Sequence, residues 1–178
     1  MRNQKGFTLI ELIIVIVVLG ILAVTAAPQF INFSSDARVS ALKGMEGSVK
    51  GAMQLTYSKA AIEGKESEAS GESITVKGNT VDLVYGYPAA SATGIINAVD
   101  GGFADSALTS DWVYEVVSGD LLIAQSSSIG GDSYTSGDIA SSGCYLTYAP
   151  ASEELDVNDD PTGNILPATV TITEQSGC

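Results

Sequence analysis

The chain has 178 residues, of which 45% are hydrophobic and only 16% are charged, enough for one domain plus one long extra element. Its formal net charge is -13, and every lysine and arginine lies at or before Lys77. A surface this acidic repels phosphate groups, which disfavours nucleic-acid binding by the C-terminal part. The surface is either simply solvated, or binds cations, or attracts basic neighbours in an assembly. The absence of histidine removes the usual general base and metal ligand.

The first element is a short basic leader followed by a long apolar run. Residues 1–6 read MRNQKG, and residues 7–33 read FTLIELIIVIVVLGILAVTAAPQFINF. A cleaved secretory signal has an apolar region of only about 7–15 residues before its cleavage site. A plain transmembrane anchor fits the length, since a span takes about 20 residues, and the basic leader would keep the N-terminus cytoplasmic. Neither explains Glu11, because a carboxylate there costs about 2.5–3.5 kcal/mol on insertion scales.

A third interpretation accounts for Glu11. Residues 6–11, Gly-Phe-Thr-Leu-Ile-Glu, resemble the type IV prepilin motif. The resemblance implies that a prepilin peptidase removes the leader between Gly6 and Phe7 and methylates the Phe7 amine. Glu11 lies one helical turn from that amine, on the same face. By the same resemblance, Glu11 pairs with the Phe7 amine of a neighbouring subunit and sets the subunit register, since paired charges relieve each other's isolation in an apolar medium.

The apolar run is predicted to be the first half of one long helix. Residues 7–33 would form the membrane anchor of the precursor and then the filament core. Gly20 and Pro28 are weak points, because proline lacks a backbone donor and kinks helices. In type IV pilus filaments the corresponding stretch is partly unwound. The resemblance therefore implies partial unwinding between Gly20 and Pro28 in this chain. Residues 34–61 are predicted to be the amphipathic second half, with one apolar stripe at three- and four-residue steps, formed by Leu42, Met45, Val49, Met53 and Tyr57.

Residues 62–178 are predicted to form a globular β-rich domain. Turn residues between alternating segments indicate hairpins at 73–77 with 80–85 and at 112–117 with 121–125. Further predictions are a short helix at 92–99, a surface loop at 126–143 and strands at 144–148 and 169–173. The expected fold class is α+β, a long N-terminal helix packed on an antiparallel sheet of about four or five strands, which is also the shape that the resemblance implies.

Two cysteines lie in the last quarter of the chain, Cys144 and Cys178. A lone pair in an exported domain indicates a disulfide bond, the alternative being two independent buried thiols. Closing this loop would stabilise the fold by about 3–4 kcal/mol in the chain-entropy model. The resemblance also implies a disulfide-closed C-terminal region.

No catalytic constellation is present in the sequence, so an enzymatic role is not expected and no cofactor is required. One acidic cluster, with Asp156, Asn158 and Asp160, offers oxygen ligands at a spacing that suits Ca²⁺. It lacks the distal glutamate of an EF-hand loop, and a solvated acidic turn is the alternative. Trp112, Tyr134 and Tyr145 are candidates for carbohydrate binding, with burial in the core as the alternative.

Several later segments are similar to the mannose-sensitive haemagglutinin (MSHA) branch of type IV pilins, namely residues 26–30, 59–64, 85–88 and 111–112. The resemblance implies a homopolymeric pilus for surface attachment and early biofilm formation. Its partners would be further copies, the prepilin peptidase, the assembly machinery with minor pilins, and the inner membrane, which the precursor crosses once with a cytoplasmic N-terminus. The alternative is a pseudopilin of a type II secretion system, which shares the anchor.

Overall fold

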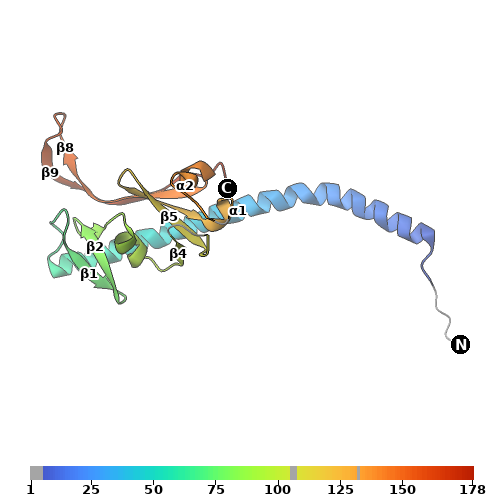
Figure 1. Ribbon diagram of the computed structural model, residues 1–178, viewed down its shortest axis with the longest axis horizontal. Helices are drawn as coiled ribbons and strands as arrows, with labels where there is room; N and C mark the ends of the chain where they lie inside the picture. The colour runs from blue at the N-terminus through green and yellow to red at the C-terminus, as the bar shows by residue number, and fades with distance from the viewer. Residues whose placement is uncertain (1–5, 105–107, 132) are drawn as a thin grey trace. The chain divides into compact units, whose positions relative to one another are not determined.

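The computed structural model describes residues 6–104, 108–131 and 133–178, and for residues 26–32 it describes the backbone alone. The chain divides into two compact units, residues 1–37 and 38–178, and each is considered by itself. Helix α1 (Leu9–Glu63) begins in the first unit and ends in the second (Figure 1). The predicted long N-terminal helix is therefore present.

In the first unit, α1 carries apolar side chains that are exposed on all sides of the helix. From Leu9 to Val24 the large apolar side chains are between 49% and 76% exposed. A helix that is apolar all round is one that is buried in its working state, so this half of α1 requires a covering that the isolated chain does not supply. Within the described residues, no helix holds a segment that is both long and apolar enough to traverse a membrane.

In the second unit, one apolar stripe of α1 forms part of the hydrophobic core. Leu42, Met45, Val49 and Met53 are buried, as the periodicity predicts, whereas Tyr57 is 37% exposed and stacks on Tyr87 with ring centroids 4.6 Å apart. The helix ends in a Schellman motif, in which a left-handed residue satisfies the last free carbonyls. Gly64 supplies that conformation, with the Gly64 N–H donating to the Ala61 carbonyl and the Lys65 N–H to the Ala60 carbonyl.

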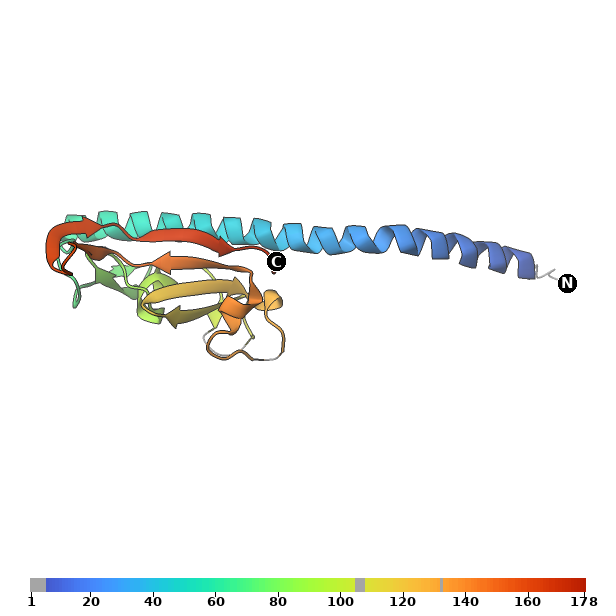
Figure 2. The ribbon, with the colours of Figure 1, turned by 90° about the horizontal axis from the view of Figure 1, so that it is seen from above.

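A five-stranded sheet lies against this stripe, with the strand order β10-β7-β6-β5-β4 (Figure 2). All neighbours are antiparallel except β4 and β5, which pair in parallel. The strands are β4 (Phe103–Ala104), β5 (Trp112–Val117), β6 (Asp120–Gln125), β7 (Tyr145–Ala149) and β10 (Thr169–Glu174). The predicted hairpin of β5 and β6 and the strands near Cys144 and Thr169 are confirmed, and so is the α+β class.

Both faces of the central strand β6 are buried. Leu121 and Ile123 pack in the cluster that contains the α1 stripe, and Leu122 and Ala124 pack in a second cluster on the opposite face. Residues from the segment after β6 cover that second face, namely Ile129, Tyr134 and Ile139. The prediction of a plain surface loop at 126–143 is therefore wrong in part. This segment holds a 3₁₀ turn (Ser126–Ser128) and α2 (Asp138–Ser142), and its three buried side chains form the outer core.

A smaller three-stranded sheet, in the order β1-β2-β3, covers the other end of the core. It consists of β1 (Ser73–Val76), β2 (Asn79–Val84) and β3 (Tyr87–Pro88). An irregular helical segment follows at Ala92–Ile96, with a kink at Gly94, where the backbone is not helical. The first hairpin is thus confirmed, with Lys77 and Gly78 at its turn, where both have a positive φ. Two consecutive positive φ values are the type I′ geometry, which matches the twist of paired strands.

One further hairpin was not predicted. It consists of β8 (Ser152–Leu155) and β9 (Pro161–Leu166), an antiparallel pair that forms its own two-stranded sheet. Every residue of β9 is exposed, and so is most of β8. Within the second unit this hairpin lies at the opposite end from α2 (Figures 1 and 2). A two-stranded hairpin without cover has few contacts of its own to stabilise it.

Tyr148 connects the two larger sheets. Its side chain is fully buried, and its hydroxyl donates to the carbonyl of Pro88 in β3. Burial raises the pKa of Tyr148, so the hydroxyl stays protonated and remains a donor. Removing this hydroxyl leaves the Pro88 carbonyl buried without its partner, which costs about 1–3 kcal/mol.

We therefore expect Tyr148→Phe to lower the free energy of unfolding of the full chain by about 1–3 kcal/mol. Urea unfolding in mild detergent measures this, with Trp112, the only tryptophan, as the fluorescent probe. Tyr145→Phe is the matched control, because the Tyr145 hydroxyl has no hydrogen bond to any residue that the structure describes, and it should change stability by less than about 0.5 kcal/mol. Equal stability of the two variants would contradict a role for the hydrogen bond.

Candidate functional site

Thr8 and Glu11 form a reciprocal cap at the start of α1. The Thr8 N–H and the Thr8 hydroxyl each donate to Glu11 Oε2 over 2.8 Å, and the Glu11 N–H donates to Thr8 Oγ1 over 3.3 Å. This is a capping box, in which two residues three apart satisfy each other's free groups at a helix start. The cap fixes the first helical residue at Leu9 and holds the Glu11 carboxylate beside the backbone that follows Phe7.

This local role of Glu11 differs from the predicted one, which is a charge pair with the Phe7 amine of another subunit. The Thr-x-x-Glu spacing ahead of an apolar run is the sequence signal for such a helix N-terminus. The two roles are compatible. In the uncut chain the carboxylate accepts hydrogen bonds from Thr8, and a cut before Phe7 would place a cationic amine one residue from Thr8.

The surroundings of Glu11 are apolar. A shallow hollow at this end of α1 is lined by Phe7, Leu12, Ile14 and Val15 together with Glu11 itself. Phe7 is 96% exposed, so the peptide bond between Gly6 and Phe7 lies at an open surface. A single carboxylate among exposed apolar side chains is costly to bury without a partner, because an isolated charge loses its hydration.

The two predicted weak points of α1 lie within its helical span. The backbone is helical at both Gly20 and Pro28, so neither residue interrupts the helix in the isolated chain. The predicted unwinding between Gly20 and Pro28 applies to the assembled filament, and the structure of a single chain does not test it. It stays a prediction.

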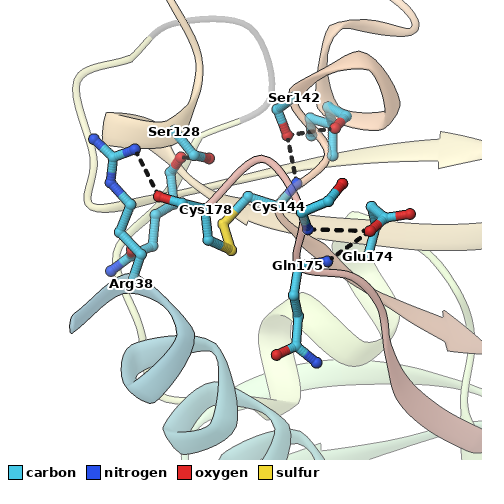
Figure 3. The surroundings of a disulfide bond; sticks show 10 residues. Arg38, Ser128, Ser142, Cys144, Glu174, Gln175 and Cys178 are labelled. Atoms are coloured by element: carbon cyan, nitrogen blue, oxygen red, sulfur yellow. Dashed lines mark hydrogen bonds between the residues drawn. A yellow bond between two sulfur atoms is a disulfide. The ribbon is translucent and has the colours of Figure 1, made fainter. Parts of the chain in front are cut away.

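The predicted disulfide bond joins Cys144 to Cys178, across a separation of 34 residues (Figure 3). Cys144 is fully buried, and its N–H donates to the Ser142 hydroxyl over 3.2 Å. The C-terminal residue is also tied to α1, since Arg38 Nη1 donates to the Cys178 carbonyl over 3.3 Å. Gly177 lies so close to Ser142 that a Cβ added to Gly177 would lie 1.9 Å from the Ser142 carbonyl oxygen.

The acidic cluster predicted as a calcium site forms the turn between β8 and β9. Asp156 Oδ1 accepts the Asn158 N–H over 2.7 Å and the Asp160 N–H over 3.0 Å. Its other carboxylate oxygen lies 3.3 Å from the side-chain amide of Asn158. Over the described part of the chain, no three metal-ligating side chains of the His, Cys, Asp and Glu types come together in a metal-binding group. The carboxylate of Asp156 thus acts within the turn itself.

These hydrogen bonds make the turn dependent on pH. The N–H groups of Asp160 and then of Asn158 lower the pKa of Asp156 below its ordinary value. A carboxyl group whose pKa is lowered by folding stabilises the fold above its unfolded pKa of about 3.9, and this contribution is lost as the pH falls through the folded pKa.

We therefore expect the amides of Asn158 and Asp160 to lose protection against hydrogen exchange as the pH falls below about 4. Hydrogen exchange measured by NMR on the full chain in detergent tests this. In Asp156→Ala the protection should be low at every pH, because the acceptor is gone. Equal protection of these two amides in Asp156→Ala and in the unsubstituted chain would show that the Asp156 carboxylate does not hold the turn.

The three aromatic candidates for carbohydrate binding belong to the core. Tyr134 is only 7% exposed, and its hydroxyl lies 3.0 Å from the Ala104 carbonyl oxygen and 2.6 Å from that of Tyr114. Trp112 packs against the first cluster and Tyr145 against the second. Packing, and not an exposed aromatic platform, accounts for all three side chains.

Comparisons with known proteins give one family match at the N-terminus and several relatives that match part of the chain. Residues 1–27 match the family of the prokaryotic N-terminal methylation motif. Fimbrial protein EcpC of Eikenella corrodens is 39% identical over 95 residues, which are 53% of this chain and 61% of that protein. The type IV major alpha-pilin of Moraxella bovis is 42% identical over 79 residues, 44% of this chain and 47% of the relative. Type II secretion system core protein G of Pseudomonas aeruginosa is 41% identical over 54 residues, 30% of this chain and 38% of the relative.

No solved structure matches the chain. The chain spans from 38% to 61% of the length of these three curated relatives. The motif at residues 1–27 makes the chain similar to proteins with a prokaryotic N-terminal methylation motif. The predicted resemblance to type IV pilins is confirmed by this motif and by the fimbrial relatives, while none of these findings distinguishes the MSHA branch.

Proposed function

We propose that the protein is a structural subunit of a type IV pilus filament. The observation that carries this proposal is the N-terminal motif at residues 1–27, followed by a helix whose apolar side chains are exposed on all sides. Such a helix half is stable only inside an apolar surrounding. A membrane supplies that surrounding to the precursor, and neighbouring copies of the same helix supply it in a filament.

Maturation follows from the same motif. A prepilin peptidase removes the leader between Gly6 and Phe7 and methylates the new Phe7 amine, which stays cationic. The precursor sits in the inner membrane as a single-pass protein with a cytoplasmic N-terminus, as the basic leader favours. In the filament, Glu11 neutralises the Phe7 amine of a neighbouring copy, and only the correct axial offset satisfies both charges.

The filament is proposed to serve surface attachment and the first stage of biofilm formation, as in the MSHA branch. The MSHA-like segments, at residues 26–30, 59–64, 85–88 and 111–112, support this. No catalytic role is proposed. Its partners are further copies of this chain, the prepilin peptidase, the assembly machinery and minor pilins.

A pseudopilin of a type II secretion system is the second candidate, and the similarity to core protein G favours it. Mechanical shearing of cells that produce the full chain separates the two functions. A pilus subunit is released as long filaments that contain this chain, whereas a pseudopilin stays with the cells. Recovery of the chain in the cell pellet alone would reject the pilus subunit and support the pseudopilin.

Calcium binding at Asp156, Asn158 and Asp160 is a separate hypothesis. Asp156 Oδ1 already accepts two backbone N–H groups, which a cation would have to displace. We therefore expect the melting temperature of the full chain to stay constant up to about 1 mM Ca²⁺, the weak end of the range for extracellular sites. A rise in melting temperature that Asp160→Asn abolishes would instead establish the site.

A further inference from the structure

Charge is strongly segregated in the second unit. Its basic residues all lie between Arg38 and Lys77, and residues 78–178 contain none. The β8–β9 hairpin and its turn carry five carboxylates, at Glu153, Glu154, Asp156, Asp159 and Asp160, and no ion pair joins any of them to a basic residue within the described ranges. Among the described residues, the hairpin therefore has no cationic partner from its own chain.

A hollow lies beside this hairpin and is lined by carboxylates. It has a volume of about 540 Å³, and the lining includes Glu66, Glu68 and Glu153 together with Tyr85. One carboxylate oxygen of Glu66 is buried and has no hydrogen-bond partner in the part of the chain that the structure describes. Desolvation, and then the negative charges of Glu153 and Glu68, raise the pKa of Tyr85. The hollow is therefore a region of concentrated negative charge.

One lysine of the second unit differs from the others in its surroundings. Lys43 is exposed on α1 and makes no ion pair or hydrogen bond with any residue that the structure describes. By contrast, each of the four remaining lysines of this unit lies within 4 Å of a carboxylate, namely Lys50, Lys59, Lys65 and Lys77.

Lys43 cannot reach the hollow of its own chain. The segment that contains Glu66 and Glu68 follows the end of α1 at Glu63. Between residue 43 and residue 63 the helix rises by about 30 Å at 1.5 Å per residue. A lysine side chain spans only a fraction of that distance, so the hollow can be filled by Lys43 only from another chain.

We propose that the carboxylate hollow formed by Glu66, Glu68 and Glu153 receives the Lys43 ammonium group of a second copy. The proposal rests on the proposed function, because a filament is what brings copies side by side. Two parallel copies displaced by about 30 Å along α1, which is the rise separating the two sites, bring the lysine of one copy level with the hollow of the other. The contact gives an exposed hairpin a neighbour and explains why acidic and basic surfaces are separated along the chain.

The test is a charge exchange in cells that produce the full chain, with sheared filaments quantified by immunoblot. Lys43→Glu and Glu68→Lys should each lower the filament yield about five-fold, since each replaces an attraction by a repulsion at one exposed pair. The double variant Lys43→Glu/Glu68→Lys should recover most of the yield, because the opposite charges face each other again. Asp111→Lys is the matched control, as Asp111 is exposed and outside the hollow, and it should leave the yield unchanged.

The outcomes are separable. If the original chain forms no filaments, the proposed function fails before this contact is tested. If filaments form and Lys43→Glu leaves their yield unchanged, or if the double variant is no better than either single variant, the contact is wrong. The cellular level of each variant and its Cys144–Cys178 disulfide, read on non-reducing gels, show whether it has folded.

Discussion

Replacing Glu11 with alanine is expected to abolish filament assembly while leaving the precursor in the cells. In the proposed mature chain, the Phe7 amine is a cation in an apolar surrounding, and a charge without a partner there costs about 2.5–3.5 kcal/mol. At 1.4 kcal/mol per factor of ten, this lowers the association constant of a subunit about 100-fold. The yield of sheared filaments, compared with the amount of chain in the cells, measures the effect.

Glu11→Gln is the control that separates the two roles of this residue. Its amide oxygen can still accept from Thr8, as Glu11 Oε2 does, so the cap of α1 is retained while the charge is removed. If the charge pair is the main role, Glu11→Gln should assemble as poorly as Glu11→Ala. Normal filaments from Glu11→Gln would show that helix capping, and not charge neutralisation, is what assembly requires.

Loss of the disulfide bond is expected to be the most destabilising change in the globular domain. The bond closes a loop between residues 34 apart, and the chain-entropy model assigns about 3–4 kcal/mol to a loop of this size. The double variant Cys144→Ala/Cys178→Ser should unfold at a correspondingly lower urea concentration. Urea titration of the full chain in detergent, followed by Trp112 fluorescence, measures the midpoint.

A second measurement guards against effects of the substitutions themselves. The original chain treated with reductant should show the same drop as the double variant, and the double variant should not respond to reductant. The hydrogen bond from Arg38 to the Cys178 carbonyl should also weaken, which would expose the C-terminus to proteolysis. A midpoint that does not move on reduction would contradict the assigned stabilisation.

Much of the fold could be predicted because local signals agree with the tertiary structure. The spacing of Leu42, Met45, Val49 and Met53 predicts the buried stripe of α1, since a helix that packs on one side carries an apolar residue every three or four positions. Likewise, Gly78 at the first hairpin turn marks a position where positive φ is required.

Other features depend on contacts that are distant in sequence. The segment from residue 126 to 143 is rich in serine and glycine, yet Ile129, Tyr134 and Ile139 cover the second face of β6. Three isolated side chains give no periodicity, so only the sheet beneath them reveals their role. The β8–β9 hairpin is exposed on both faces, so it lacks the apolar alternation by which strands are recognised.

At the N-terminal site, the structure adds a local cap that was not predicted. The roles that the motif predicts for Gly6, Phe7 and Glu11 stay predictions, whereas the part played by Thr8 follows from its hydrogen bonds to the Glu11 carboxylate. Thr8 is one turn from Glu11 and lies just before an apolar run, so the spacing alone was sufficient to predict the cap.

Mass spectrometry of the N-terminal peptide from sheared material tests the central claim most directly. The account predicts a mature chain that begins at Phe7 with a methylated α-amine and lacks residues 1–6. A chain that retains the leader, or one cut after the apolar run near Ala27, would contradict it, because the amine that Glu11 is proposed to neutralise would then not exist at that position.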